Sequence, residues 1–86
     1  MCQYAVRMRT TRYFDEQVLR KRPYLELEWI ESVLRSPTHR ERQPDGRVRL
    51  WGYIAPLGRW LRVVTLEDGE TVHNAFPDRG FEGPVP

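Results

Sequence analysis

The spacing of apolar residues changes along the chain, and each change predicts a different element. Apolar residues at every second position between residues 4 and 8 predict a short N-terminal strand. From 11 to 22 the spacing becomes helical, because Phe14 and Val18 stand four positions apart and two acidic residues directly follow Phe14. Pro23 then ends this helix or opens the next one.

The stretch from 25 to 35 begins with the alternation of a strand and continues with the spacing of a helix. Leu27, Ile30 and Leu34 fall on one helical face. A Ser-Pro pair follows as a stop signal, and the length of the stretch favours the helix. Two helices joined at Pro23 form a helical hairpin, and the apolar stripe on each helix requires a partner surface.

Turn-forming residues divide the second half of the chain into the four strands of an antiparallel meander. The turns are expected at Pro44–Gly46, Ala55–Gly58 and Asp68–Gly69. The strands lie near 38–43, 47–54, 59–67 and 70–76, and the first is polar enough to be a sheet edge. The sequence therefore predicts one α+β domain over residues 1–80 and a flexible C-terminal tail at 81–86.

The loop lengths assign the strand residues to two sheet faces. A four-residue loop at 55–58 places Tyr53 opposite Trp60 and Trp51 opposite Arg62. One face is nearly apolar and suits the helices; it carries Val48, Leu50, Gly52, Ile54, Leu61, Val63, Val72, Asn74 and Phe76. The other, which we call the arginine–aromatic face, is formed by Arg47, Arg49, Trp51, Tyr53, Trp60 and Arg62, with Val64, Thr71 and His73 beside them.

The position of His73 depends on the last turn. A two-residue turn at Asp68–Gly69 places Val64 opposite His73 and Leu61 opposite Phe76, which adds His73 to the arginine–aromatic face. A longer loop would shift the last strand by one residue and send His73 to the other face. The separation of faces on the two central strands is independent of this choice.

The composition narrows the classes of function without selecting one. Fourteen basic and twelve acidic residues leave a formal net charge of +2, so only the distribution of charge can indicate a nucleic-acid partner. Lys21 is the only lysine, and arginine is the better ligand for phosphate, although GC-rich coding sequence gives the same bias. The sequence has no metal-binding or phosphate-loop motif, so neither a metal nor a cofactor is expected.

Cysteine content and the N-terminal residues bear on the compartment. The single cysteine, Cys2, cannot form an intramolecular disulfide, which fits a reducing compartment. Residues 1–10 lack the apolar core of a secretion signal, and no apolar run approaches the roughly 20 residues of a membrane-spanning helix. We expect a cytoplasmic protein that has no membrane partner.

The arginine–aromatic face is the main candidate for function. Guanidinium groups bind phosphate and flat rings stack on bases, which is the combination found on RNA-binding surfaces. The expected nucleic-acid ligands are Arg47, Arg49, Trp51, Trp60 and Arg79. Arg79 could instead form a surface pair with Asp78. Two alternatives stay open for the whole face, which could bind a protein partner or pack beneath a terminal segment of the same chain.

His73 is the candidate for proton transfer, because the ordinary pKa of histidine suits acid–base chemistry near neutral pH. Metal-free cleavage of RNA uses the 2′-OH as nucleophile and needs a base, an acid and cations. His73 beside Arg62, with Tyr53 or Arg49 nearby, would supply these groups. The alternatives are that His73 is structural or merely solvated, and His39, on the polar edge strand, is a weaker candidate.

The order of the elements and two short motifs resemble a known group of proteins. Residues 30–37, Ile-Glu-Ser-Val-Leu-Arg-Ser-Pro, resemble the end of the second helix of the RelE/ParE and BrnT superfamily of bacterial toxins, and residues 60–64 resemble its central strand. The resemblance in topology covers residues 4–79. It implies a RelE-like fold, cleavage of free or ribosome-associated mRNA, and a cognate antitoxin that covers the basic face.

The resemblance also bears on individual residues. Arg62 matches the sheet arginine of the family, and Arg79 roughly matches the arginine after its last strand. Where RelE-type toxins commonly carry tyrosine or histidine near the C-terminus, this chain has Phe76 and Phe81. The leading hypothesis is a toxin-like RNA-binding protein, which could also act as a metal-independent endoribonuclease. The alternative is a small non-enzymatic interaction module that forms a homodimer or docks on a partner protein.

Overall fold

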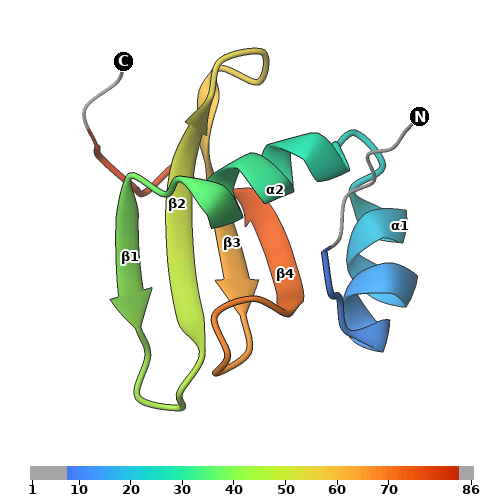
Figure 1. The fold of residues 1–86 in the computed structure, drawn as a ribbon. Coiled ribbons are helices and arrows are strands. Elements are labelled where there is room, and N and C mark those ends of the chain that lie inside the picture. The colour runs from blue at the N-terminus through green and yellow to red at the C-terminus, as the bar shows by residue number, and fades with distance from the viewer. Residues whose placement is uncertain (1–7, 84–86) are drawn as a thin grey trace.

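The computed structural model describes residues 8–83, and in them two helical segments precede an antiparallel sheet (Figure 1). The first segment is a π-helical turn, η1 (Phe14–Val18), that continues as α1 (Leu19–Lys21); the second is α2 (Leu27–Arg35). The strands are β1 (His39–Arg42), β2 (Val48–Ile54), β3 (Arg59–Thr65) and β4 (Val72–Pro77), in the spatial order β1-β2-β3-β4. The predicted α+β class and the four-stranded antiparallel meander are confirmed.

The segment before the first helix is attached to the β4 edge of the sheet. Thr10 forms a parallel bridge with Val72. The Thr11 N–H donates to the Val72 carbonyl at 2.9 Å, and the Val72 N–H donates to the Arg9 carbonyl at 2.8 Å. The N-terminal strand predicted at 4–8 lies almost wholly outside the described residues and stays a prediction.

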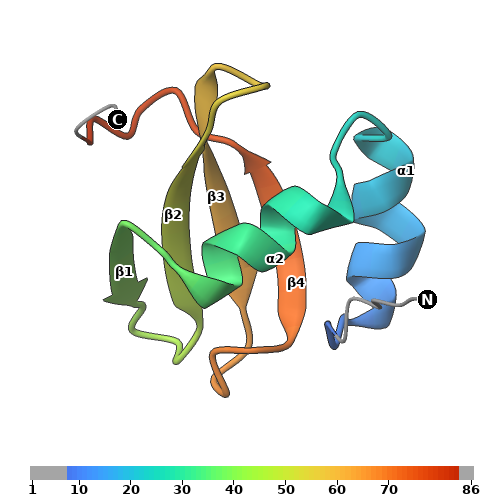
Figure 2. The ribbon, with the colours of Figure 1, turned by 45° about the horizontal axis from the view of Figure 1, so that its top comes forward.

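Helix α2 lies across one face of the sheet and buries Ile30 and Val33 (Figure 2). Leu27, predicted to belong to the apolar stripe of this helix, is instead 41% exposed. Gly52 of β2 accounts for the close approach on the buried side, because a Cβ there would lie 2.8 Å from Cγ2 of Val33. Val33 fills the space that the missing side chain leaves, and α2 is turned accordingly.

The first helical segment stands beside β4 at the end of the sheet (Figure 1). Phe14 and Val18 are fully buried there, as their spacing predicts. Thr11 begins the segment, since its hydroxyl accepts a hydrogen bond of 3.1 Å from the Phe14 N–H. Because α2 packs instead on β2 and β3, the two helices are held by the sheet more than by each other.

The register of the two central strands agrees with the prediction from the loop at 55–58. Trp51 pairs with Arg62 and Tyr53 with Trp60. Val48, Leu50, Ile54, Leu61 and Val63 are buried beneath the helices. The arginine–aromatic face is therefore the sheet face opposite α2. No helix in residues 8–83 is long and apolar enough to cross a membrane.

The predicted register of the last strand is wrong by one residue over most of its length. Arg62 pairs with Phe76 and Val64 with Asn74, while Thr65 pairs with Val72 across an irregularity in the ladder. Phe76 and Asn74 thus lie on the arginine–aromatic face, and Ala75 takes the core position. His73 is left as the extra residue between two ladder pairs.

The shift begins at the extra residue His73, because Thr65 still pairs with Val72 as predicted and only the pairs beyond it are displaced. Residues 66–71 join β3 to β4, and the Leu66 N–H donates to the Thr71 carbonyl at 2.9 Å. The Asp68 carboxylate accepts from the Thr71 hydroxyl and from the N–H groups of Thr71 and Glu70. These hydrogen bonds lower the pKa of Asp68 to about 2, and the bond from the Thr71 hydroxyl is the largest cause.

Candidate nucleic-acid interface

The centre of the arginine–aromatic face is covered by residues 78–83, which we call the strap. Trp51 and Trp60 are only 4% and 6% exposed. The Phe81 ring stacks on Trp51, with ring centres 5.0 Å apart and planes 13° apart, and meets Trp60 edge-on at 4.9 Å. The packed part of the chain therefore extends past residue 80, where the sequence placed the end of the domain.

Asp78 fixes the start of the strap to the same face. Its Oδ2 accepts hydrogen bonds from Trp51 Nε1 at 2.8 Å and from Arg62 at 3.0 Å (Nε) and 2.8 Å (Nη2). Burial alone would raise the pKa of Asp78, but the hydrogen bonds from Trp51 and Arg62 outweigh it and lower the pKa. The carboxylate is ionised at neutral pH and compensates the charge of Arg62.

Arg62 forms an ion pair with Asp78, and its guanidinium group is also enclosed by aromatic rings. Its guanidinium carbon lies 4.9 Å from the centre of the Phe76 ring and 5.5 Å from that of Trp51. Its side chain is 26% exposed, and that of Asp78 11%. The predicted catalytic cation Arg62 and the predicted stacking ligands Trp51 and Trp60 thus already have partners within the chain.

His73 lies with the first helical segment and forms no hydrogen bond to Arg62 or Tyr53 within the described part of the chain. Its Nδ1 is 3.1 Å from the Thr11 hydroxyl, and its ring stacks on Tyr13 at 4.8 Å. That hydroxyl already accepts from Phe14, so we assign its proton to a bond with Nδ1, which places the ring proton on Nε2. Tyr53 instead meets Trp60 edge-on at 5.5 Å.

The electrostatic surroundings of His73 favour the neutral ring. Burial is the larger cause of its lowered pKa, and the positive charge of Arg47 is the second. A neutral ring with an acceptor nitrogen can take a proton, which is what a general base requires. The predicted catalytic set of His73, Arg62 and Tyr53 is therefore not assembled, but His73 has another arginine near it.

Arg47, Arg49 and Arg79 remain as cations of the predicted interface. Arg49 is half-buried on β2, and Arg47 and Arg79 are exposed. None of the three forms an ion pair with another residue in the range 8–83. These arginines are free to bind an anion from outside. Arg47 directly precedes β2, and the alternation of side chains places it on the same side of the sheet as Arg49.

His39 belongs to this face, although its strand is polar throughout. It pairs with Trp51, and its ring centre lies 5.3 Å from Trp51 and 5.8 Å from Phe81. Its Nε2 is 3.1 Å from a Glu41 carboxylate oxygen. The register of the first hairpin would have placed His39 here, but the composition of the strand gave no sign of an aromatic contact.

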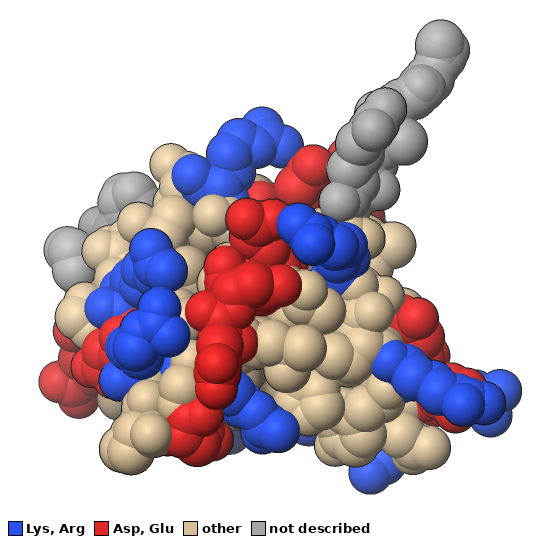
Figure 3. Space-filling view, turned by 60° about the horizontal axis from the view of Figure 1, so that its bottom comes forward, with Lys and Arg blue, Asp and Glu red and all other residues tan. Residues whose placement is uncertain are grey.

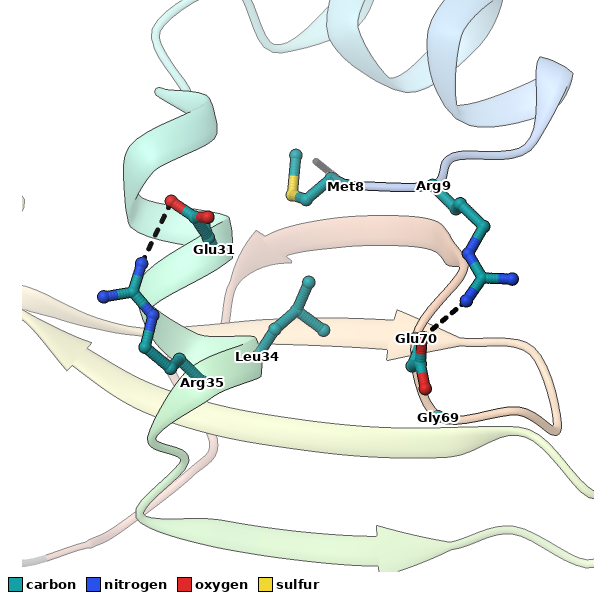
Figure 4. Close-up of a pocket in the computed structure, with 7 residues that line it drawn as sticks. All are labelled: Met8, Arg9, Glu31, Leu34, Arg35, Gly69 and Glu70. Carbon is teal, nitrogen blue, oxygen red and sulfur yellow. Dashed lines mark hydrogen bonds and ion pairs between the residues drawn. The ribbon is translucent and has the colours of Figure 1, made fainter. Parts of the chain in front are cut away.

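The opposite side of the molecule has a pocket of about 300 Å³ between α2, the N-terminal segment and the β3–β4 loop (Figure 4). Two ion pairs stand on either side of Met8 and Leu34: Arg9–Glu70 at 2.7 Å and Glu31–Arg35 at 3.2 Å. Because each arginine already has a carboxylate, the pocket has little charge left to recruit an anionic ligand.

The end of the molecule that carries the β1–β2 and β3–β4 turns has mixed charge. Acidic side chains form a band there, with basic side chains on both sides (Figure 3). Asp45, Glu67 and Asp68 line a second, open pocket together with Arg47. Within residues 8–83, no three or more histidine, cysteine, aspartate or glutamate side chains are placed so that together they could hold a metal ion.

Comparison with known proteins gives no match, whether with family models, with curated proteins or with solved structures. The function is therefore argued from the contacts of this chain.

Proposed function

We propose that the chain is a toxin-like RNA-binding protein that holds the phosphate backbone with Arg47 and Arg49. The observation that carries the proposal is that neither arginine has an ion-pair partner among the described residues, while strand alternation assigns both to one side of the sheet. Arginine binds phosphate in a bidentate manner, and two such groups on one strand suit successive phosphates. Asn74, on the same face, supplies an amide that can bind a base edge or a sugar hydroxyl.

A catalytic form of this proposal uses His73. Its Nδ1 would take the proton of a 2′-OH that displaces the Thr11 hydroxyl from this nitrogen, and Arg47, whose charge reaches His73, would stabilise the phosphorane that follows. Arg62 and Tyr53 are not needed for this arrangement. Neutralisation by an antitoxin would then require a protein that covers Arg47 and Arg49.

RNA binding is tested with a fluorescein-labelled single-stranded RNA and the variant Arg47→Gln/Arg49→Gln. We expect the double variant to bind about tenfold to a hundredfold more weakly, and its log Kd to change less steeply with log salt, by about 1.4, because two phosphate contacts are lost. The matched control is Arg20→Gln, an exposed arginine of α1. Equal weakening in both variants, or no binding by the wild type at low salt, contradicts the proposal.

Cleavage is tested separately in a bacterial host. Expression of the wild type without its genomic neighbour should arrest growth and fragment mRNA, and His73→Gln should relieve both while RNA binding in vitro persists. Fragmentation that persists in the His73→Gln variant would remove His73 from the chemistry. Intact transcripts with the wild type would leave a binding protein without nuclease activity.

One observation favours the second candidate, a non-enzymatic interaction module. Tyr24, in the turn before α2, and Leu27, the first residue of α2, are 49% and 41% exposed, which places apolar surface where a partner could dock. This candidate predicts a molecular mass that rises with concentration, together with no retardation of RNA at low salt. Tyr24→Ser/Leu27→Ser should abolish the rise in mass.

A further inference from the structure

The strap fits the surface beneath it closely. Besides the contacts of Asp78 and Phe81, a Cβ on Gly83 would lie 2.8 Å from the Trp60 ring and 2.5 Å from the Phe81 ring. Gly83 therefore packs directly on the indole, where no larger residue fits. The Asp78 N–H adds one backbone hydrogen bond of 2.8 Å to the Trp60 carbonyl.

Trp51, Trp60 and Arg62, which we call the slot, offer the strap two kinds of contact. An indole face accepts a flat ring in parallel, and a guanidinium with an indole N–H surrounds an anion. A nucleotide needs the same two contacts, one for its base and one for its phosphate. In the structure Phe81 occupies the position suited to a base, and the Asp78 carboxylate occupies the position suited to a phosphate.

We propose that the slot is a nucleotide-binding subsite for single-stranded RNA and that the strap competes with RNA for it. This inference rests on the proposed function, because it extends the RNA path from Arg49 to the neighbouring Trp51 and Arg62 of the same face. His39, whose ring lies near both Trp51 and Phe81, borders the slot. The strap keeps the wild type in a weakly binding state.

Release of the strap disturbs little of the fold. The strap lies after β4, and its contacts with the slot come from the side chains of Asp78 and Phe81, the backbone of Gly83 and the single backbone bond to Trp60. The ladder that joins β2 to β3 contains no residue of the strap. The strap can therefore open locally while the core stays folded.

The test compares Phe81→Ala and Asp78→Asn with the wild type in the background Trp29→Phe, so that fluorescence reports Trp51 and Trp60 alone. The probe is an oligouridine of about 12 nucleotides, within the site sizes of single-strand binders. We expect both variants to bind it about fivefold to tenfold more tightly, with quenching of tryptophan fluorescence that the wild type shows only at higher RNA concentration. Asp78→Asn should also steepen the salt dependence, since it frees one phosphate ligand.

The two proposals fail in different ways. If neither the wild type nor the strap variants bind oligouridine, the proposed function fails. If binding depends on Arg47 and Arg49 but is equally tight with and without the strap side chains, and the fluorescence is unquenched, only the slot inference fails.

Circular dichroism checks that the variants fold. If they do not, photocrosslinking of thiouridine-labelled RNA to the wild type decides: crosslinks at Trp51 or Trp60 support the slot, and crosslinks confined elsewhere overturn it.

Discussion

His73 shows how two neighbours decide the protonation of a single residue. Thr11 bonds to its Nδ1, and Tyr13 covers one side of the ring. Burial and the charge of Arg47 both penalise the imidazolium form, so the pKa in the folded state lies below the ordinary value of 6.5. The unfolded chain therefore binds a proton at a higher pH than the folded protein does.

This difference predicts that acid destabilises the protein through His73. The free energy of unfolding should be constant above the unfolded pKa and should fall as the pH drops from about 7.5 towards the lower folded pKa, because the unfolded state takes up the proton first. Urea unfolding at a series of pH values measures the slope. In His73→Gln the free energy of unfolding should depend less steeply on pH. An unchanged slope in that variant would mean that another group causes the pH dependence.

At the scale of single elements, the contact between α2 and β2 depends on one missing side chain. In Gly52→Ala the new Cβ would stand 2.8 Å from Val33 Cγ2 and 3.6 Å from the Val33 Cα, so the helix has to move. We expect a loss of about 1–3 kcal/mol of stability, as for other overpacked cores. Thermal unfolding measures it. Gly80→Ala, whose nearest neighbour would be 3.4 Å away, is the matched control and should cost much less.

A double variant separates crowding from an effect on strand propensity. If the Cβ of Gly52→Ala destabilises by collision, Val33→Ala should recover part of the loss when the two changes are combined, giving a coupling of about 1 kcal/mol. Purely additive losses would show that Val33 is not the obstacle.

The same elements show which parts of the fold could be predicted from the sequence. The pairing of Trp51 with Arg62 could be predicted, because a proline and a glycine mark the length of the loop between β2 and β3. The pairing of β4 beyond Val72 could not be predicted, because Thr65 keeps its predicted partner and one extra residue, His73, then shifts the ladder. Local periodicity does not indicate where an extra residue interrupts a ladder.

The occupied state of the candidate site was harder to predict. That a terminal segment could cover the arginine–aromatic face was one of the open alternatives. Which residue would do so was not evident, because Asp78 and Trp51 are 27 positions apart and their contact depends on the path of the chain after Pro77. A carboxylate followed at a short distance by an aromatic residue is the only available signal, and Asp78 fits a surface pair with Arg79 equally well.

Across the whole molecule, charge is mixed, and this limits how RNA can bind. The net charge is +2, and an acidic band lies between basic regions at the turn end (Figure 3). Long-range attraction of RNA should therefore be weak, and affinity should come from a few direct phosphate contacts. With two or three such contacts, raising the salt from about 50 to about 200 mM should weaken binding about tenfold. A far steeper dependence would mean a larger basic footprint than Arg47, Arg49 and Arg79 provide.

The six-residue loop between β3 and β4 also constrains how such a chain can evolve. The pairing of β2 with β3 depends on a different loop, so a one-residue deletion between Leu66 and Thr71 would shift β4 alone by one residue wherever the ladder keeps its extra residue. Every side chain of that strand would then exchange sides, bringing Phe76 into the position of Ala75 beneath the helices. Substitutions within this loop should be tolerated wherever Asp68 keeps its bonds, whereas insertions and deletions should be eliminated by selection.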